Sequence, residues 1–304
     1  MTRIARRNLR NGLLFISPWI VGFLAFQVYP ILYSLRLSFS DYTGFGVPVW
    51  NGLQNFKQML KDDLFWKSAY NTIYYTALAV PLGVVVALAI AIAMNQKVRE
   101  VALYRAILYV PSILPVFALS FVWVVFLNPR YGLFNAFWRT LGFPMIDWIG
   151  NPAWTKLSIV IMAQLGAGGP ALIFLAALRG VPKEILESAE IDGAGTIRRF
   201  FRITLPLITP VIFYDIILGL SMGLQVFTQA FILSNGASGG SGGSTTAGPR
   251  NSLLFYVFYL YNNAFRYTQM GFAAALSWVL FIVSIVLALL VVRWAKTWVR
   301  YDIS

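Results

Sequence analysis

The sequence contains no cysteine and no histidine among its 304 residues. The first absence excludes disulfides and thiolate chemistry. The second removes the usual base of a nucleophilic triad, and the two together remove the Cys and His ligands of zinc sites. We therefore expect no metal site, no bound cofactor and no catalytic residues in this chain.

Charged residues are also scarce, at 12% of the chain against about 25% in soluble domains. Hydrophobic residues make up 59%, and the mean hydropathy is +0.70. So few polar groups cannot cover a water-exposed surface, which indicates a lipid-embedded protein. The net charge of +13 does not indicate nucleic-acid binding, because the basic residues flank apolar runs, as they do where membrane proteins fix their orientation.

The apolar runs predict an all-α polytopic membrane protein with about six transmembrane helices. Each run approaches the roughly 20 residues needed to cross a bilayer. The first is long and shows no convincing cleavage site, so we expect a retained helix and not a signal peptide. The expected spans are residues 13–35, 68–94, 103–127, 157–178, 207–233 and 270–292.

Basic residues between the spans predict the orientation. One set of loops and termini holds 15 basic residues and the opposite set holds 9. The more basic side faces the cytoplasm, so both termini and the loop 179–206 should be cytoplasmic. The Gly/Ser-rich stretch 234–250 is expected to be a flexible external loop. Its Gly236-to-Gly240 match to G-x-S-x-G is not a hydrolase motif, since the chain has no histidine base.

The cytoplasmic loop carries a short helix pattern. Pro182 suits a first helical turn, and Glu184 and Glu187 lie near the positive end of the helix dipole. Gly193 permits an abrupt reversal before a second, basic helix. The residues alone leave two interpretations open, an interfacial loop with ordinary caps and a docking element for another protein.

The same loop resembles the EAA loop of ABC importer permeases. Glu187-Ser188-Ala189 is followed by Gly193 and then by Ile203-x-Leu205-Pro206, at every spacing of the family pattern, with Ser188 in place of an alanine. Tyr29-Pro30 and Asn71-Thr72 resemble the sugar-type permeases (MalF-like or UgpA-like). The resemblance implies a MalF-like fold in the bacterial inner membrane and a coupling helix that binds an ATPase. Its implied coupling residues are Glu187, Ser188, Ala189, Asp192 and Gly193.

The resemblance also implies partners. These are a second homologous permease, which can be identical or different, two cytoplasmic ATPases, and an extracytoplasmic solute-binding protein. The sequence has no G-x-x-x-x-G-K-[ST] loop, so ATP and Mg²⁺ should bind the ATPase subunits, and this chain should not be an enzyme. Beyond these subunits we expect contact with membrane lipid and none with nucleic acid.

Polar residues inside the fifth and fourth spans are candidates for the solute pathway. On a continuous helix, Asp215, Gly219, Met222, Gln225, Val226 and Gln229 would form one stripe, with Thr228 beside it. Gln164 begins a Gly-rich run ending at Pro170, which predicts a broken helix. Trp278 could stack on a sugar ring. The alternatives for the fifth span are a small-residue packing seam at Gly219 and Gly223 and a pairing of Asp215 with a neighbouring helix. The alternative for the Gly-rich run is a simple kink or close helix packing.

Three functions remain possible at this stage. The leading one is the permease subunit of an ATP-driven importer for a di- or oligosaccharide. A related alternative is import of glycerol 3-phosphate or a polyol. An alternative from another class is an ion-coupled secondary transporter with Asp215 as its coupling site.

Overall fold

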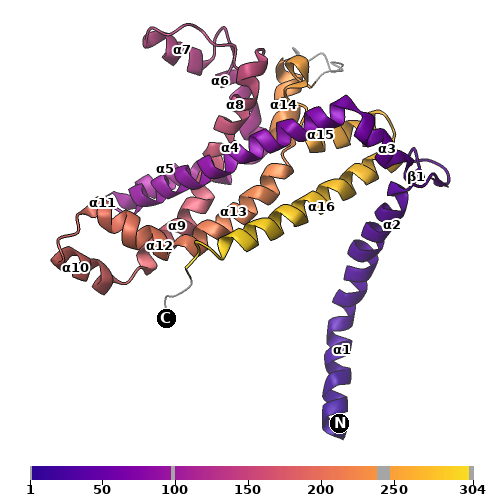
Figure 1. The fold of residues 1–304 in the computed structure, drawn as a ribbon, viewed down its shortest axis with the longest axis horizontal. Helices are drawn as coiled ribbons and strands as arrows, with labels where there is room; N and C mark the ends of the chain where they lie inside the picture. The colour runs from indigo at the N-terminus through magenta and orange to yellow at the C-terminus, as the bar shows by residue number, and fades with distance from the viewer. Residues whose placement is uncertain (1, 97–99, 238–246, 301–304) are drawn as a thin grey trace. The chain divides into compact units, whose positions relative to one another are not determined.

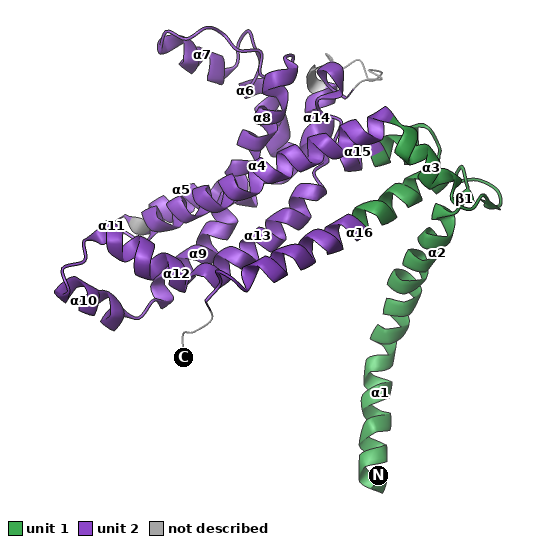
Figure 2. Ribbon diagram, viewed as in Figure 1, with its two compact units in different colours: residues 1–62, 260–281 green, residues 63–259, 282–304 purple. Residues whose placement is uncertain are grey.

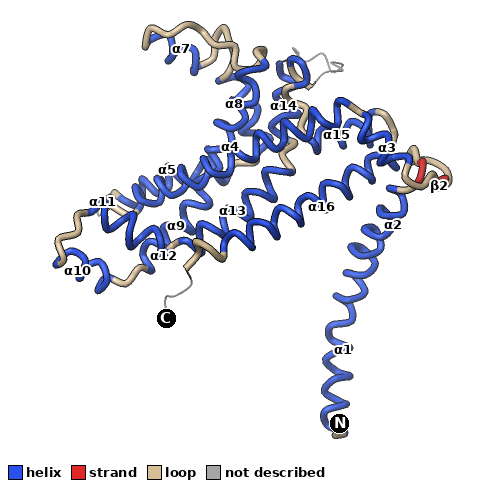
Figure 3. The backbone as a smooth tube through the Cα atoms, in the orientation of Figure 1, coloured by secondary structure: helices blue, strands red, loops and turns tan. Residues whose placement is uncertain are grey.

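The computed structural model describes residues 2–96, 100–237 and 247–300 and divides the chain into two compact units (Figures 1 and 2). Unit 1 comprises Met1–Asp62 and Leu260–Phe281, and unit 2 comprises Asp63–Tyr259 and Ile282–Ser304. Helix dominates both units, and the strands are a single two-stranded ribbon (Figure 3). Of the helices in the described residues, five are long and apolar enough to cross a membrane, or up to six if one bent pair counts as a span.

Unit 1 combines an N-terminal helical run with a short ribbon. Its elements are α1 (Arg3–Phe23), the π-helix η1 (Leu24–Val28), α2 (Tyr29–Ser38), β1 (Ser40–Asp41), β2 (Val49–Trp50), α3 (Gln54–Lys61), the π-helix η5 (Asn262–Arg266) and the start of α16 (Met270–Ala295). The buried Asn55 donates from Nδ2 to the carbonyls of Ser38 (2.9 Å) and Ser40 (3.0 Å), which fixes α3 against the ribbon. A Cβ at Gly271 would collide with the Ser40 carbonyl oxygen, so only glycine fits there.

Unit 2 contains the remaining helices. In chain order they are α4 (Asp63–Met94), α5 (Val101–Ile113), α6 (Val116–Phe126), α7 (Leu133–Thr140), α8 (Pro152–Ala163), the 3₁₀ helix η2 (Gln164–Ala167), α9 (Gly168–Gly180), α10 (Lys183–Ile191), α11 (Thr196–Arg199), the π-helix η3 (Phe200–Thr204), α12 (Leu205–Leu207), α13 (Thr209–Leu224), α14 (Thr228–Ala237), the 3₁₀ helix η4 (Pro249–Asn251) and most of α15 (Tyr256–Tyr261).

Helix α4 is the centre of unit 2, because α8, α9 and α13 all pack against it. Ala87 and Ala91 of α4 are fully buried against Ala171 and Phe174 of α9. Hydrophobic transfer does not drive helices together in lipid, so close packing of small side chains has to do so. The alanines allow the backbones of α4 and α9 to approach each other closely.

The expected span 103–127 is not one continuous helix, because the structure bends it by 97° between α5 and α6. Leu114 has extended backbone angles (ψ 138°) and Pro115 follows it. Proline lacks an N–H and disfavours helical angles in the residue before it. The Leu114-Pro115 pair therefore separates two helices where the hydropathy alone suggested one.

The expectation of a flexible loop over 234–250 is also wrong at its start, where α14 continues to Ala237. At its other end, Pro249–Asn251 forms η4. The stretch between, 238–246, lies outside the described residues.

Asn71 of α4 joins two distant parts of unit 2. Its fully buried amide donates to the carbonyls of Asn251 and Leu254, both at 2.9 Å. At the next residue, Thr72 Oγ1 accepts from the backbone N–H of Tyr256 at 2.8 Å. Residues 251–256 are thereby held on α4 although Arg250 and Asn251 adopt positive φ angles of 52° and 57°.

Replacing Asn71 by alanine should destabilise the protein by about 2–3 kcal/mol, because two buried carbonyls lose their donor. The measurement is the thermal denaturation midpoint of the purified protein in detergent. Ile73→Ala is the matched control, since Ile73 lies on the same helix and is 60% exposed. Equal midpoints for the two variants would show that the Asn71 bonds do not support the fold.

Candidate functional site

Two long apolar helices of unit 2 are broken along their length. The first gives way to the 3₁₀ turn η2 at Gln164–Ala167, as the Gly-rich run ending at Pro170 predicts. The second stops at Leu224, leaves Gln225, Val226 and Phe227 outside any helix, and resumes as α14 at Thr228. The expected continuous helix over residues 207–233 is therefore wrong. A broken helix frees backbone groups that lipid cannot satisfy, so such breaks occur where protein or a wet cavity surrounds them.

Both breaks face one cavity of about 850 Å³. Helix α4 supplies one wall, including Tyr75 and Gly83, and α9 and α13 supply others. The polar side chains that line it are Gln164, Asp215, Ser221, Gln225, Thr228 and Gln229, together with the Tyr75 hydroxyl. The rest of the lining is apolar and includes Met222. A cavity with a few convergent polar groups in apolar walls is the usual form of a small-molecule site.

Every pathway candidate from the fourth and fifth spans lies in this lining, but Trp278 does not. Trp278 belongs to unit 1, where its Nε1–H donates to Ser34 Oγ at 3.1 Å. Its contact with solute stays a prediction. The sequence analysis missed Tyr75, Ser221 and Phe227. Ser221 lies four residues before Gln225 and so close to it on a helix surface, which was the available signal. Tyr75 comes from a different span and needed the fold.

Several acceptor atoms of the cavity have no partner among the described residues. Gln164 donates from Nε2 to Val160 O (2.8 Å), and its buried Oε1 accepts nothing. Gln225 donates from Nε2 to Ser221 O (3.0 Å), which leaves its Oε1 available. Asp215 is half-buried and makes no hydrogen bond or ion pair with any described residue. The cavity therefore favours a ligand rich in hydrogen-bond donors, such as hydroxyl groups.

Gly219 and Gly223 serve packing as well as the cavity. A Cβ at Gly219 would lie 3.1 Å from Val80, and one at Gly223 would lie 2.9 Å from Thr76, both on α4. The packing-seam interpretation is therefore correct for these two glycines. The polar residues of the same helix still line the cavity, so the two interpretations hold for different positions.

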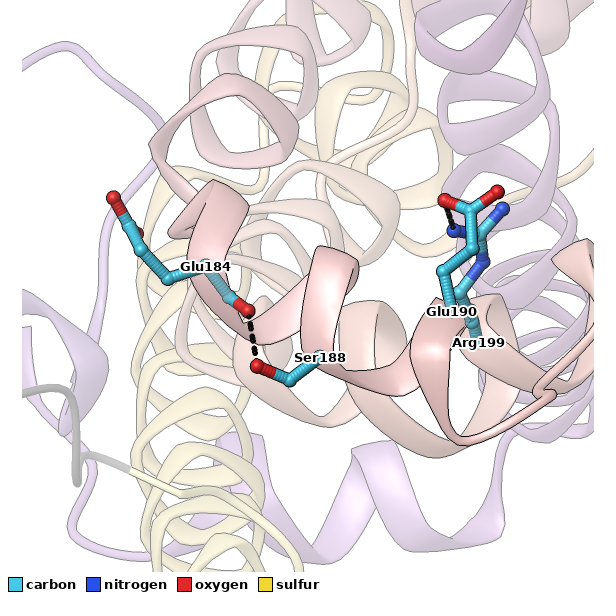
Figure 4. A network of polar contacts seen from close by, with 4 residues as sticks. All are labelled: Glu184, Ser188, Glu190 and Arg199. Atoms are coloured by element: carbon cyan, nitrogen blue, oxygen red, sulfur yellow. Dashed lines mark hydrogen bonds and ion pairs between the residues drawn. The ribbon is translucent and has the colours of Figure 1, made fainter.

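The second candidate region is α10 with the turn that follows it. The helix ends in a Schellman motif, since Gly193 N–H donates to Glu190 O (3.0 Å) and Ala194 N–H donates to Ala189 O (2.9 Å). Gly193 takes φ +76°, an angle that side chains rarely adopt. Figure 4 shows Ser188 Oγ donating to Glu184 O (2.7 Å) within the helix and Arg199 paired with Glu190 (2.6 Å) across the turn.

The expected coupling residues divide into those that are exposed and those that are not. Glu187, Ser188 and Asp192 are exposed, and Ile191 is 86% exposed. Ala189 is buried on the inner side of the helix. The α10 surface therefore offers carboxylates beside an exposed aliphatic side chain, while Ala189 and Gly193 fix the shape of the loop behind them.

A second surface follows the turn. Ile197, Arg198, Phe201 and Arg202 line an open cleft of about 670 Å³ together with Gly195 and Thr196. Ile197 is 76% exposed and Phe201 is 61% exposed. Exposed apolar side chains next to charged ones indicate an interaction surface, not a catalytic site.

The chain matches known proteins over nearly all its length. Residues 79–300 match the family of inner membrane components of binding-protein-dependent transport systems. The probable ABC transporter permease YesP of Bacillus subtilis is 37% identical over 99% of this chain and 95% of its own. The lactose transport permease LacF of Rhizobium radiobacter is 32% identical over 92% of both chains.

Solved structures agree on the fold. A bacterial alginate ABC transporter, crystallised with a periplasmic protein that holds an alginate pentasaccharide, superposes with a TM-score of 0.81 at 21% identity. The match covers 97% of this chain and 98% of that one. The chain belongs to the family of inner membrane components of binding-protein-dependent transport systems. It is a helical, polytopic permease subunit of an ABC importer.

Gly83→Leu should block the cavity without unfolding the protein. The one atom within 4 Å of a Cβ at this position is Gln164 Oε1, at 3.6 Å, so a larger side chain enters open space beside the first break. We expect uptake to fall by about tenfold or more, since a leucine side chain fills space that a solute needs. Gly22→Leu is the control, because nothing lies within 4 Å of that position either. Uptake that survives Gly83→Leu in a well-expressed protein would exclude the cavity as the pathway.

Proposed function

We propose that this chain forms half of the translocation pore of an ATP-driven sugar importer, and that the 850 Å³ cavity holds the solute during passage. The observation that carries the proposal is the set of unpartnered acceptors, Gln164 Oε1, Gln225 Oε1 and the Asp215 carboxylate, at two helix breaks. Transporters bind substrates at discontinuous helices near mid-membrane. A sugar is the solute class whose many hydroxyl donors suit such acceptors.

The charge of the cavity favours some of the solutes named for the relatives over others. Their names include lactose, trehalose and maltose, and sn-glycerol 3-phosphate. Asp215 is the charged residue in the described lining, and no lysine or arginine accompanies it. A carboxylate repels a phosphate that occupies the same cavity by on the order of 1–3 kcal/mol. We therefore favour a neutral di- or oligosaccharide over glycerol 3-phosphate.

The remaining subunits follow from the same proposal. A second homologous permease completes the pore, and a solute-binding protein delivers sugar on the side opposite α10. Two ATPases bind ATP and Mg²⁺, and this chain's α10 fits a groove on one of them through Glu187, Ser188, Asp192 and Ile191, which are exposed. The transporter would lie in a bacterial inner membrane with both termini of this chain in the cytoplasm.

The connectivity of α10 explains how a distant ATPase could open the cavity. Val181 and Pro182 join α10 to α9, and the segment from α11 to α12 joins it to α13. Gly169, Pro170 and Ile173 of α9 line the cavity, and so do Asp215 and Leu218 of α13. A displacement of α10 is thus carried by the backbone into two walls of the site. Because the chain belongs to a family of ABC importer permeases, ion coupling by Asp215 is not needed to drive transport.

Replacing Gly193 by valine should reduce the amount of ATPase that co-purifies by about tenfold. A β-branched residue at φ +76° strains the turn by on the order of 1–2 kcal/mol and redirects α10. Gly180→Val is a close control, because Gly180 is exposed in the last turn of α9 and nothing lies within 4 Å of its Cβ position. Equal ATPase recovery from the two variants would contradict the coupling role, and uptake by the wild-type protein without nucleotide would contradict the ATP-driven function.

The wild-type transporter should take up a neutral di- or trisaccharide at least about tenfold faster than glycerol 3-phosphate, given the repulsion at Asp215. Asp215→Asn should narrow this ratio by raising glycerol 3-phosphate uptake. Uptake of both radiolabelled solutes by cells that express the complete transporter measures the ratio. Asp41→Asn, a carboxylate outside the cavity lining, is the control. Comparable uptake of the two solutes by the wild type would refute the neutral-sugar assignment.

A further inference from the structure

The segment 127–151, which connects α6 to α8 and contains α7, is built as a rigid hairpin. Asn135 is buried and donates from Nδ2 to Pro129 O (3.0 Å) and Ile146 O (2.8 Å). Its Oδ1 accepts from Trp148 Nε1–H at 3.0 Å and from the Ile146 N–H at 3.2 Å. One amide therefore holds both arms of the hairpin together.

Aromatic rings complete the inner side of this hairpin. Phe134 packs on Trp123 and Trp148 with ring centroids 5.2 and 5.9 Å apart, and Trp138 packs on Trp148 at 6.2 Å. Trp148 is 4% exposed. The segment therefore has its own small core, and its outer side chains are held in place.

The outer side of the hairpin is apolar, although nothing in the described chain covers it. Six large side chains there are between 50% and 71% exposed, namely Tyr131, Leu133, Phe137, Leu141, Phe143 and Met145. Leu133 and Phe137 of α7 and the C-cap residue Leu141 follow one another at intervals of four and so form one stripe. Arg139 lies about 200° around the helix from Phe137. A contiguous apolar face of this kind marks a protein or membrane contact.

Both ends of the hairpin are fixed at membrane-spanning helices. Candidate span residues end at Phe126 on one side and begin at Pro152 on the other. Figure 1 shows α7 at the far end of α8, away from α10. The hairpin therefore lies at a membrane boundary, on the side opposite the coupling loop.

We propose that this apolar face is inserted in the interfacial layer of the lipid bilayer. Aromatic and aliphatic residues on one side of a short helix with arginine on the other are typical of helices that lie in the membrane plane. Arg130 and Arg139 are exposed and suit phospholipid phosphates. A solute-binding protein that docks and leaves in each cycle would expose the six side chains to water between cycles, whereas lipid covers them throughout.

The absence of cysteine allows a direct test with single-cysteine variants of this chain in the complete transporter. Phe137→Cys and the matched Arg139→Cys are labelled with the fluorophore NBD and placed in phosphatidylglycerol–phosphatidylethanolamine nanodiscs. Lipids with a doxyl group near the headgroup should quench the label at position 137 about threefold more than at 139, and aqueous iodide should show the reverse order. Leu133→Cys should behave as Phe137→Cys and covers the case in which that variant fails to assemble.

Two outcomes would overturn the proposal. Efficient iodide quenching at 133 and 137 would place the stripe in water. Protection of these positions from both iodide and doxyl lipid would place it against protein, with the second permease as the permanent partner. Both results are independent of which solute the transporter carries.

Discussion

The structure depends on where backbone hydrogen-bonding groups can be left unpaired within a lipid-embedded protein. A helix satisfies its own groups, and a break in it is tolerated only where protein or a wet cavity replaces the lost bonds. Here the breaks at Gln164–Ala167 and at Gln225–Phe227 border the same cavity. The cavity therefore accounts for both breaks, and the polar side chains near them are the ones that the proposed function assigns to a hydroxyl-rich solute.

A second constraint links this cavity to the coupling loop. Two of the helices that carry cavity walls, α9 and α13, are connected to α10 in the chain, α9 directly and α13 through the segment from α11 to α12. The Schellman motif at Gly193 and the Arg199–Glu190 pair make the loop a stiff connector. Stiffness matters, because a loop that bent freely would absorb a displacement of α10 instead of passing it on. In the function proposed above, the ATPase is the motor, and this loop is its mechanical connection to the cavity.

Much of the fold followed from the sequence, because span length and basic-residue distribution are local properties. The break beginning at Gln164 was also predictable from its glycines and Pro170. The break at Gln225–Phe227 was not, since those three residues include neither glycine nor proline. The Asn135 hairpin was equally hidden, because its bonds join residues that are 6 to 13 positions apart with no regular period. The grouping of Tyr75 with Asp215 required the packing of α4 on α13.

The bonds of Asn71 and Thr72 have a consequence for motion during transport. They fasten residues 251–256 to the first part of α4, near its N-terminal end. That end of α4 is therefore tied to the approach to α15. At the other end of α4, Arg105 of α5 donates to the Met94 carbonyl, and Arg179 of α9 donates to Asn95 Oδ1 at 3.4 Å. Any movement of α4 during transport should therefore carry residues 251–256 with it, and the start of α15 should follow α4 instead of moving on its own.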